Sequence, residues 1–197
     1  DYVGRLARWT RLNMSRVDGL YLSLTQPAAA AFIADNLSDL LRAYAFDGVY
    51  LDHVLYPGDD FDYSRRSVEV FRDAMRAQLS PADRQRLEAV EAIDPFAYPN
   101  EFPDQWRLFR RSQLTALVAR LRTVVKSARP AAILSAAVTA DAATAEQVTL
   151  QDWRTWLDNG FLDALCPIEA GTSAVQFASQ VAGVQGLAGG RQVWAGI

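Results

Sequence analysis

The chain has 197 residues; half are hydrophobic, 22% are charged, and the formal net charge is -3. This composition indicates one soluble globular domain with a sizeable core, without the basic surplus typical of nucleic-acid binding. No apolar run reaches the roughly 18 residues of a membrane span. A single cysteine, Cys166, excludes an internal disulfide, and with His53 as the single histidine it argues against a clustered zinc site. We therefore expect no metal and no other cofactor.

The first half of the chain predicts helices around one short strand. Thr25-Gln26-Pro27 is typical of a helix start, and apolar residues then recur at helical spacing as far as Tyr44. The turn pair Asp47-Gly48 precedes a predicted buried strand. Residues 58–103 are predicted to be an insertion of loops and helices, with Asp94–Pro103 irregular. A long helix is then expected to run from about Trp106 to near Pro130.

The second half alternates strand and helix patterns. Strands are predicted at Ala132–Val138, Leu162–Ile168 and Gln192–Ile197, with helices at Gln151–Asn159 and Ser173–Val184 between them. Alternation of this kind predicts parallel βαβ units. The four strands are therefore expected to be parallel neighbours in chain order, with helices on one face only.

Asp52 stands out because of its place on the first predicted strand. Since strand side chains alternate, Val49 and Leu51 are expected on one face and Tyr50 and Asp52 on the other. Parallel α/β folds carry their chemistry at the C-terminal ends of the strands, and Asp52 lies at such an end. The alternative is that Asp52 caps a loop or pairs with an arginine.

Four segments, in order, resemble one known family. They are Asp47-Gly48-Val49-Tyr50-Leu51-Asp52-His53-Val54-Leu55-Tyr56-Pro57, Phe109–Leu114, Leu134–Val138, and the block from Gln151-Asp152-Trp153 to Cys166-Pro167-Ile168. They are similar to motifs of the bacterial glycosyl-hydrolase-like family 10, a TIM-barrel family related to glycoside hydrolases. Two departures are visible: His53 replaces a tyrosine, and Glu169-Ala170 stands where the family has a small residue followed by tyrosine.

This resemblance implies an α/β fold: a partial TIM (β/α)8 barrel, roughly its second half, with outer helices. Residues 1–197 would form a single incomplete barrel domain, with 58–103 inserted on the active-site side and further strands before Asp1 and after Ile197. It also implies a glycoside hydrolase that acts on a bacterial poly- or oligosaccharide, including cell-envelope glycans and peptidoglycan strands stripped of their peptides. An extracytoplasmic location (secreted, periplasmic or lipoprotein) is expected from the same resemblance.

Most glycosidases work with two carboxylates, one acting as acid and the other as nucleophile or base. Asp52 is the first candidate, and Glu169 and Asp141 are candidates for its partner. The alternatives are a surface or ion-paired glutamate at Glu169 and a loop residue starting a helical turn at Asp141. Asp47 and Asp163, at strand starts, are predicted to stabilise turns.

Six residues are predicted to bind substrate, because aromatic faces pack on sugar rings and arginines match the family's Arg-Arg pair: Tyr50, His53, Tyr56, Tyr63, Arg110 and Arg111. Trp153 and Trp156, at i and i+3 on a predicted helix, are instead expected in the core. Two rival functions remain open. One is a non-catalytic carbohydrate-binding barrel; the other is a metal-dependent hydrolase, which the single histidine disfavours.

Overall fold

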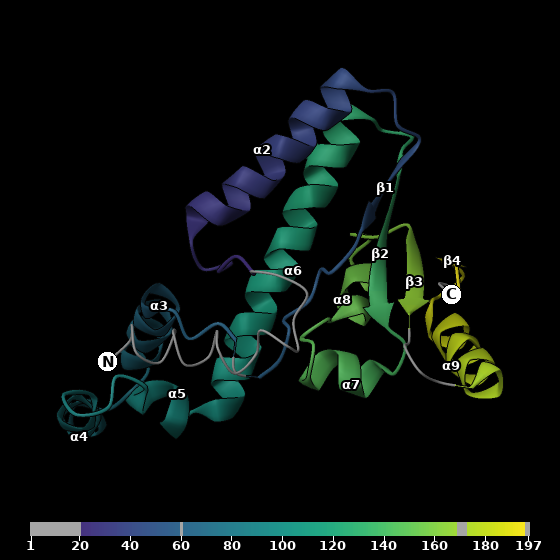
Figure 1. The fold of residues 1–197 in the computed structure, drawn as a ribbon. Coiled ribbons are helices and arrows are strands. Elements are labelled where there is room, and N and C mark those ends of the chain that lie inside the picture. The colour runs from purple at the N-terminus through teal and green to yellow at the C-terminus, as the bar shows by residue number, and fades with distance from the viewer. Residues whose placement is uncertain (1–20, 60, 169–172, 196–197) are drawn as a thin grey trace.

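The computed structural model describes residues 21–59, 61–168 and 173–195. Within them it has eight helices and four strands (Figure 1). In chain order these are α2 (Pro27–Ala43), β1 (Gly48–Leu51), α3 (Arg65–Arg76), α4 (Pro81–Glu91), α5 (Ala97–Glu101), α6 (Pro103–Ala128), β2 (Ile133–Thr139), α7 (Ala142–Gln147), α8 (Trp153–Asp158), β3 (Ala164–Ile168), α9 (Ala174–Leu187) and β4 (Gln192–Val193).

The four strands form one parallel sheet in the order β1-β2-β3-β4. Leu51 pairs with Ala136, Ala136 pairs with Leu165, and Leu165 pairs with Val193, so the register continues across the whole sheet. The predicted parallel order is confirmed. The C-terminal ends of β1, β2 and β3 consequently lie along one edge, and the residues that follow these strands emerge beside one another.

The two faces of the sheet carry different side chains. Seven residues with alternating positions join the main hydrophobic core under the helices: Val49, Leu51, Leu134, Ala136, Val138, Leu165 and Val193. The side chains of Ala137, Ala164 and Cys166 are also buried, but they lie on the opposite face and outside that core. We call this opposite face, with Tyr50, Ser135, Ala137, Ala164 and Cys166, the inner face. In the described part of the chain, the helices thus cover one face, as predicted.

Helices α2 and α6 pack against each other beside β1. Figure 1 shows α2 and α6 side by side, and Ala34 of α2 shares a hydrophobic cluster with Leu117 and Leu121 of α6. Both helices begin with proline, at Pro27 and Pro103, whose fixed φ suits the first helical turn. Among the described residues, no helix is both long enough and apolar enough to cross a membrane.

The predicted insertion forms a second hydrophobic cluster beside the first turns of α6. Its buried residues are Val68, Phe71, Met75, Leu87, Phe96, Tyr98 and Trp106. Ser64 and Ser80 cap α3 and α4 by accepting hydrogen bonds from Ser67 and Asp83 backbone N–H groups. These caps, which the sequence pattern contains, explain why two helices start where they do.

Several predicted boundaries are wrong. Asp94–Pro103 is not irregular throughout, because it contains α5, whose Tyr98 packs in the second cluster. The helix predicted at Gln151–Asn159 begins only at Trp153, since Asp152 is its N-cap. The last strand comprises Gln192–Val193; residues 196–197 of its predicted range lie outside the described residues. Trp153 and Trp156 are buried in the main core, as predicted.

Asp163 stabilises the start of β3. Its carboxylate accepts a hydrogen bond from the Leu134 backbone N–H at 2.8 Å and ion pairs with Arg122 at 2.6 Å and Lys126 at 3.0 Å. Partial burial alone would raise the pKa of Asp163, but these hydrogen bonds outweigh burial and lower the pKa to about 2. Asp163 therefore connects α6 to the N-terminal edge of the sheet, whereas Asp52 follows β1 at the C-terminal edge.

Candidate active site

Asp52 directly follows β1 at the C-terminal edge of the sheet. Its Oδ1 accepts a hydrogen bond from the backbone N–H of His53 at 2.9 Å, and its Oδ2 lies 3.2 Å from Nδ1 of the His53 imidazole. His53 adopts a positive φ of 50°, a conformation uncommon for residues other than glycine. Both side chains are more than half exposed, so the carboxylate is accessible from solvent.

Tyr50 lies next to Asp52 on the inner face, with half of its surface exposed. Burial, the Asp52 carboxylate and the Cys166 thiol, in that order, raise the pKa of Tyr50, so its hydroxyl stays protonated at neutral pH. The predicted alternation on β1 is therefore confirmed: Val49 and Leu51 join the core, and Tyr50 presents an aromatic surface beside Asp52.

Gln151 connects the ends of β1 and β2. Its side chain is 1% exposed, and its Nε2 donates to Val54 O at 3.2 Å and to Ala137 O at 2.9 Å. Its Oε1 accepts from the Thr139 backbone N–H at 2.9 Å. The Tyr56 backbone N–H adds a neighbouring contact by donating to Thr149 O. The segment after Asp52 is thus held against the loop that follows α7.

Tyr56 and Arg110 lie inside the protein. Tyr56 is 1% exposed and Arg110 is 3% exposed. The Arg110 guanidinium donates to the carbonyl oxygens of Asp59 and Phe61 and lies over the rings of Tyr56, Tyr63 and Trp106 at 5.3–5.9 Å from their centroids. Burial lowers the pKa of Arg110 and, as the largest cause, raises that of Tyr56. The Arg110 guanidinium thus holds the loop after Asp52 through two of its carbonyl oxygens and packs against the Tyr56 ring.

Asp62 ends the same loop in a buried cluster of hydroxyl groups. The hydroxyls of Ser23 and Ser67 donate to its Oδ2 at 2.5 and 2.7 Å, and the Ser64 backbone N–H donates to Oδ1 at 3.1 Å. Thr25 in turn contacts the Ser67 hydroxyl. The cluster links the start of α3 to the segment that precedes α2.

A cavity of about 360 Å³ opens beside this loop. The loop contributes His53, Tyr56 and Phe61 to its wall, α2 contributes Ile33, and α6 contributes Leu114 and Leu117. His53 is therefore shared between the cavity and the Asp52 carboxylate. The lining is mainly apolar, so the cavity suits an apolar group rather than a charged one.

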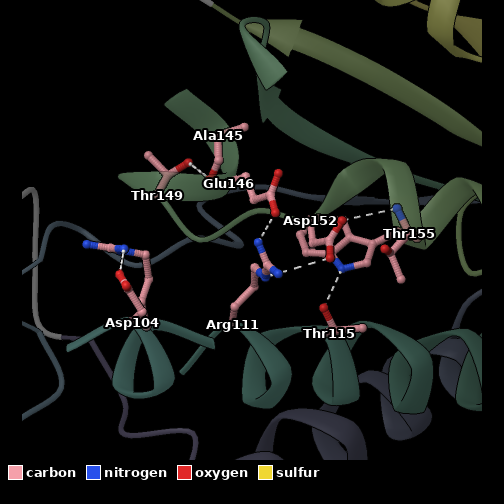
Figure 2. A network of polar contacts seen from close by, with 10 residues as sticks. Asp104, Arg111, Thr115, Ala145, Glu146, Thr149, Asp152 and Thr155 are labelled. Atoms are coloured by element: carbon pink, nitrogen blue, oxygen red, sulfur yellow. Dashed lines mark hydrogen bonds and ion pairs between the residues drawn. The ribbon is translucent and has the colours of Figure 1, made fainter. Parts of the chain in front are cut away.

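Arg111 takes part in a separate polar network. Figure 2 shows its guanidinium, which extends from α6, between the carboxylates of Glu146 and Asp152. The Asp152 carboxylate lies 3.7 Å from Arg111 Nε and also caps α8 by accepting from the Thr155 backbone N–H. Trp156 of α8 donates from its indole N–H to the Thr115 hydroxyl of α6 at 2.9 Å. Arg111 thereby connects α6 with α7 and α8.

Of the two candidate carboxylate partners of Asp52, the structure describes Asp141 but not Glu169. Asp141 follows β2 and is the N-cap of α7, with Oδ1 accepting from the backbone N–H and the hydroxyl of Thr144 at 2.7 and 2.6 Å. These hydrogen bonds lower the pKa of Asp141. Glu169 lies outside the described residues.

Tyr63 is half-buried and packs its ring near Phe96 and Trp106.

The structure therefore brings Asp52, His53 and Tyr50 together at the C-terminal end of β1. It groups Arg110 with Tyr56 and Tyr63 separately, with the guanidinium over both rings. Sequence reasoning did not single out Gln151 or Asp62. The sequence signals for Gln151 are its place in the Gln151-Asp152-Trp153 segment and its polar side chain directly after the apolar Leu150. In the described part of the chain, no group of three or more His, Cys, Asp or Glu side chains could hold a metal ion.

Comparison with known proteins gives one family-level finding. The model of the family described as glycosyl hydrolase-like 10 matches residues 5–184. This match covers all the elements from β1 to β3 and most of α9. A search among curated proteins found no match.

Proposed function

We propose that this chain, which belongs to the glycosyl hydrolase-like 10 family, hydrolyses glycosidic bonds and uses Asp52 as one of two catalytic carboxylates. The observation that carries the proposal is the accessible Asp52 carboxylate at the C-terminal end of β1, beside the exposed Tyr50 ring. Parallel α/β folds carry active sites at this edge. We further propose that the parallel sheet is part of a (β/α)8 barrel whose interior is the inner face.

The chemistry assigned to Asp52 follows from its surroundings. Its two oxygens are oriented by the backbone and imidazole of His53, so the carboxylate has a defined direction although it is exposed. A carboxylate oriented in this way can act as nucleophile or as general base on a glycosidic carbon. The ring of Tyr50 offers a flat apolar surface on which a sugar can pack.

For the second carboxylate we propose one of two residues that come soon after β2 and β3 in the sequence, Asp141 and Glu169. Asp141 has a lowered pKa and therefore suits a base that stays ionised, whereas an acid needs a raised pKa. Glu169 directly follows β3 in the sequence, and we propose it as the acid. As substrate we propose a bacterial cell-envelope glycan, such as peptidoglycan strands without their peptides, and hence an extracytoplasmic location.

The test compares the full-length wild-type protein with Asp52→Asn on envelope-derived glycan. The substitution preserves shape but can neither ionise nor transfer a proton, so turnover should fall by about 10²–10⁴-fold. Glycan affinity should change little, because ring packing and the remaining hydrogen bonds are unaffected. Near-normal turnover would remove Asp52 from the mechanism.

The rival function, a non-catalytic carbohydrate-binding barrel, has one observation in its favour: Asp141 is already engaged as the N-cap of α7. The same experiment separates the two functions. Glycan binding by both proteins with hydrolysis by neither would favour the binding function, and binding weakened by Tyr50→Ala would then locate the sugar on the inner face.

A further inference from the structure

We infer that Gln151 is a positioning residue, which holds the Asp52–His53 turn against the end of β2 so that the carboxylate keeps its direction. Gln151 lies 97 residues from Val54 in the sequence, yet its Nε2 donates to the Val54 carbonyl oxygen, two residues after Asp52. This inference rests on the proposed function where it concerns turnover, and on geometry alone where it concerns the position of His53.

The hydrogen bonds of Gln151 use both ends of its amide. The two donor hydrogens reach Val54 O and Ala137 O, and the oxygen accepts from the Thr139 N–H and from the Thr149 hydroxyl at 3.2 Å. Three of these partners are backbone groups, two at the end of β2 and one, Val54 O, in the segment after β1. A buried backbone group left unpaired is destabilising, so these partners favour one arrangement of the β2 end and the segment after β1.

Backbone conformation supports the same assignment. In the described part of the chain, the non-glycine residues with positive φ are His53, at 50°, and Leu150, at 55°. Each directly precedes one partner of the contact between Val54 and Gln151. Such conformations are unfavourable for residues other than glycine and persist only where surrounding contacts impose them. The Gln151 amide is a contact that can impose both.

Gln151 acts on the position of Asp52 through the backbone of His53, Val54 and Leu55. The Val54 carbonyl is fixed by Gln151, the Leu55 N–H donates to His53 O at 2.9 Å, and His53 engages both oxygens of Asp52. A displacement of about 1 Å at a reacting group can cost on the order of 10²-fold in rate. Loss of the amide should therefore reduce kcat more than it raises KM.

Two substitutions test this role. Gln151→Leu removes all four hydrogen bonds at similar volume, and kcat should fall by about 10- to 100-fold with KM nearly unchanged. Gln151→Glu keeps the acceptor but donates only while its carboxyl is protonated, so its activity relative to wild type should recover as the pH is lowered. The control is Gln147→Glu, an exposed amide on α7, which should match wild type at every pH.

A second measurement does not depend on hydrolysis. His53 is the only histidine of the 197 residues, so its imidazole C–H resonance reports on the Asp52–His53 pair and can be assigned by its loss in His53→Gln. The resonance should move in Gln151→Leu, measured where circular dichroism shows the variant folded, and stay in place in Gln147→Glu. An unmoved His53 resonance in folded Gln151→Leu would overturn the inference. Absence of hydrolysis by wild type would overturn the proposed function instead, and the resonance would still decide the role of Gln151.

Discussion

The imidazole Nδ1 of His53 lies 3.2 Å from Oδ2 of Asp52, while the His53 backbone N–H donates to Oδ1 of the same carboxylate. One residue therefore contacts both oxygens of its neighbour. The backbone contact is independent of the side chain at this position, whereas the imidazole contact is exposed to solvent. The two contacts should consequently respond differently to substitution.

His53→Gln removes the imidazole but keeps the backbone N–H that orients Asp52. An exposed side-chain contact to a carboxylate contributes about 0–1 kcal/mol, so turnover should fall by no more than about fivefold, far less than in Asp52→Asn. Steady-state kinetics of the two full-length variants on the same glycan provide the comparison. If His53→Gln lost as much activity as Asp52→Asn, His53 would itself take part in proton transfer.

Arg110→Met should destabilise the fold by about 2–3 kcal/mol, because the carbonyl oxygens of Asp59 and Phe61 lose their donor and three aromatic rings lose a cation. The exposed Arg120 on the same helix is the matched control, and Arg120→Met should lie within about 0.5 kcal/mol of wild type. Chemical denaturation measures both. Equal stability of the two variants would show that Arg110 does not hold the loop.

Asp163→Asn should lower the free energy of unfolding at neutral pH by about 1–2 kcal/mol, since an amide cannot pair with Arg122 and Lys126 as a carboxylate does. The folded-state pKa of about 2 lies below the ordinary value of 3.8. Stability from this carboxylate is therefore fully present above about pH 4 and is lost as the pH falls towards 2. The difference between wild type and Asp163→Asn, from urea melts, should shrink over that range. A difference independent of pH would exclude the carboxylate charge as its cause.

Cys166 should react slowly with thiol reagents in the folded protein. Burial raises the pKa of its thiol, and the hydrogen bond with Ser135 only partly opposes this effect. Less thiolate and restricted access should make labelling at pH 8 at least about tenfold slower than in denaturant. Because Cys166 is the only cysteine, mass spectrometry follows a single event. Rapid labelling of the native protein would show that reagents reach the inner face between β2 and β3.

The order of the strands and the faces of their side chains could be predicted because both follow from local periodicity. Alternation from Val49 to Asp52 separates core from inner face, and the strand-helix rhythm after Pro130 predicts parallel neighbours. The core tryptophans Trp153 and Trp156 were likewise predictable, since a helical stripe depends on residues a few positions apart.

The burial of the polar side chains near Asp52 depends on contacts between segments that are distant in the sequence. Tyr56 and Arg110 have the residue types of a sugar-binding loop, yet 49 residues of chain separate Arg110 from the Phe61 carbonyl that it contacts inside the protein. The contact of Gln151 with Val54 spans 97 residues and has no local pattern at all. The sequence by itself thus determined the sheet and the place of Asp52, because these depend on local alternation and order. Only the tertiary structure decided which polar side chains near Asp52 are buried supports, because burial depends on segments that meet after folding.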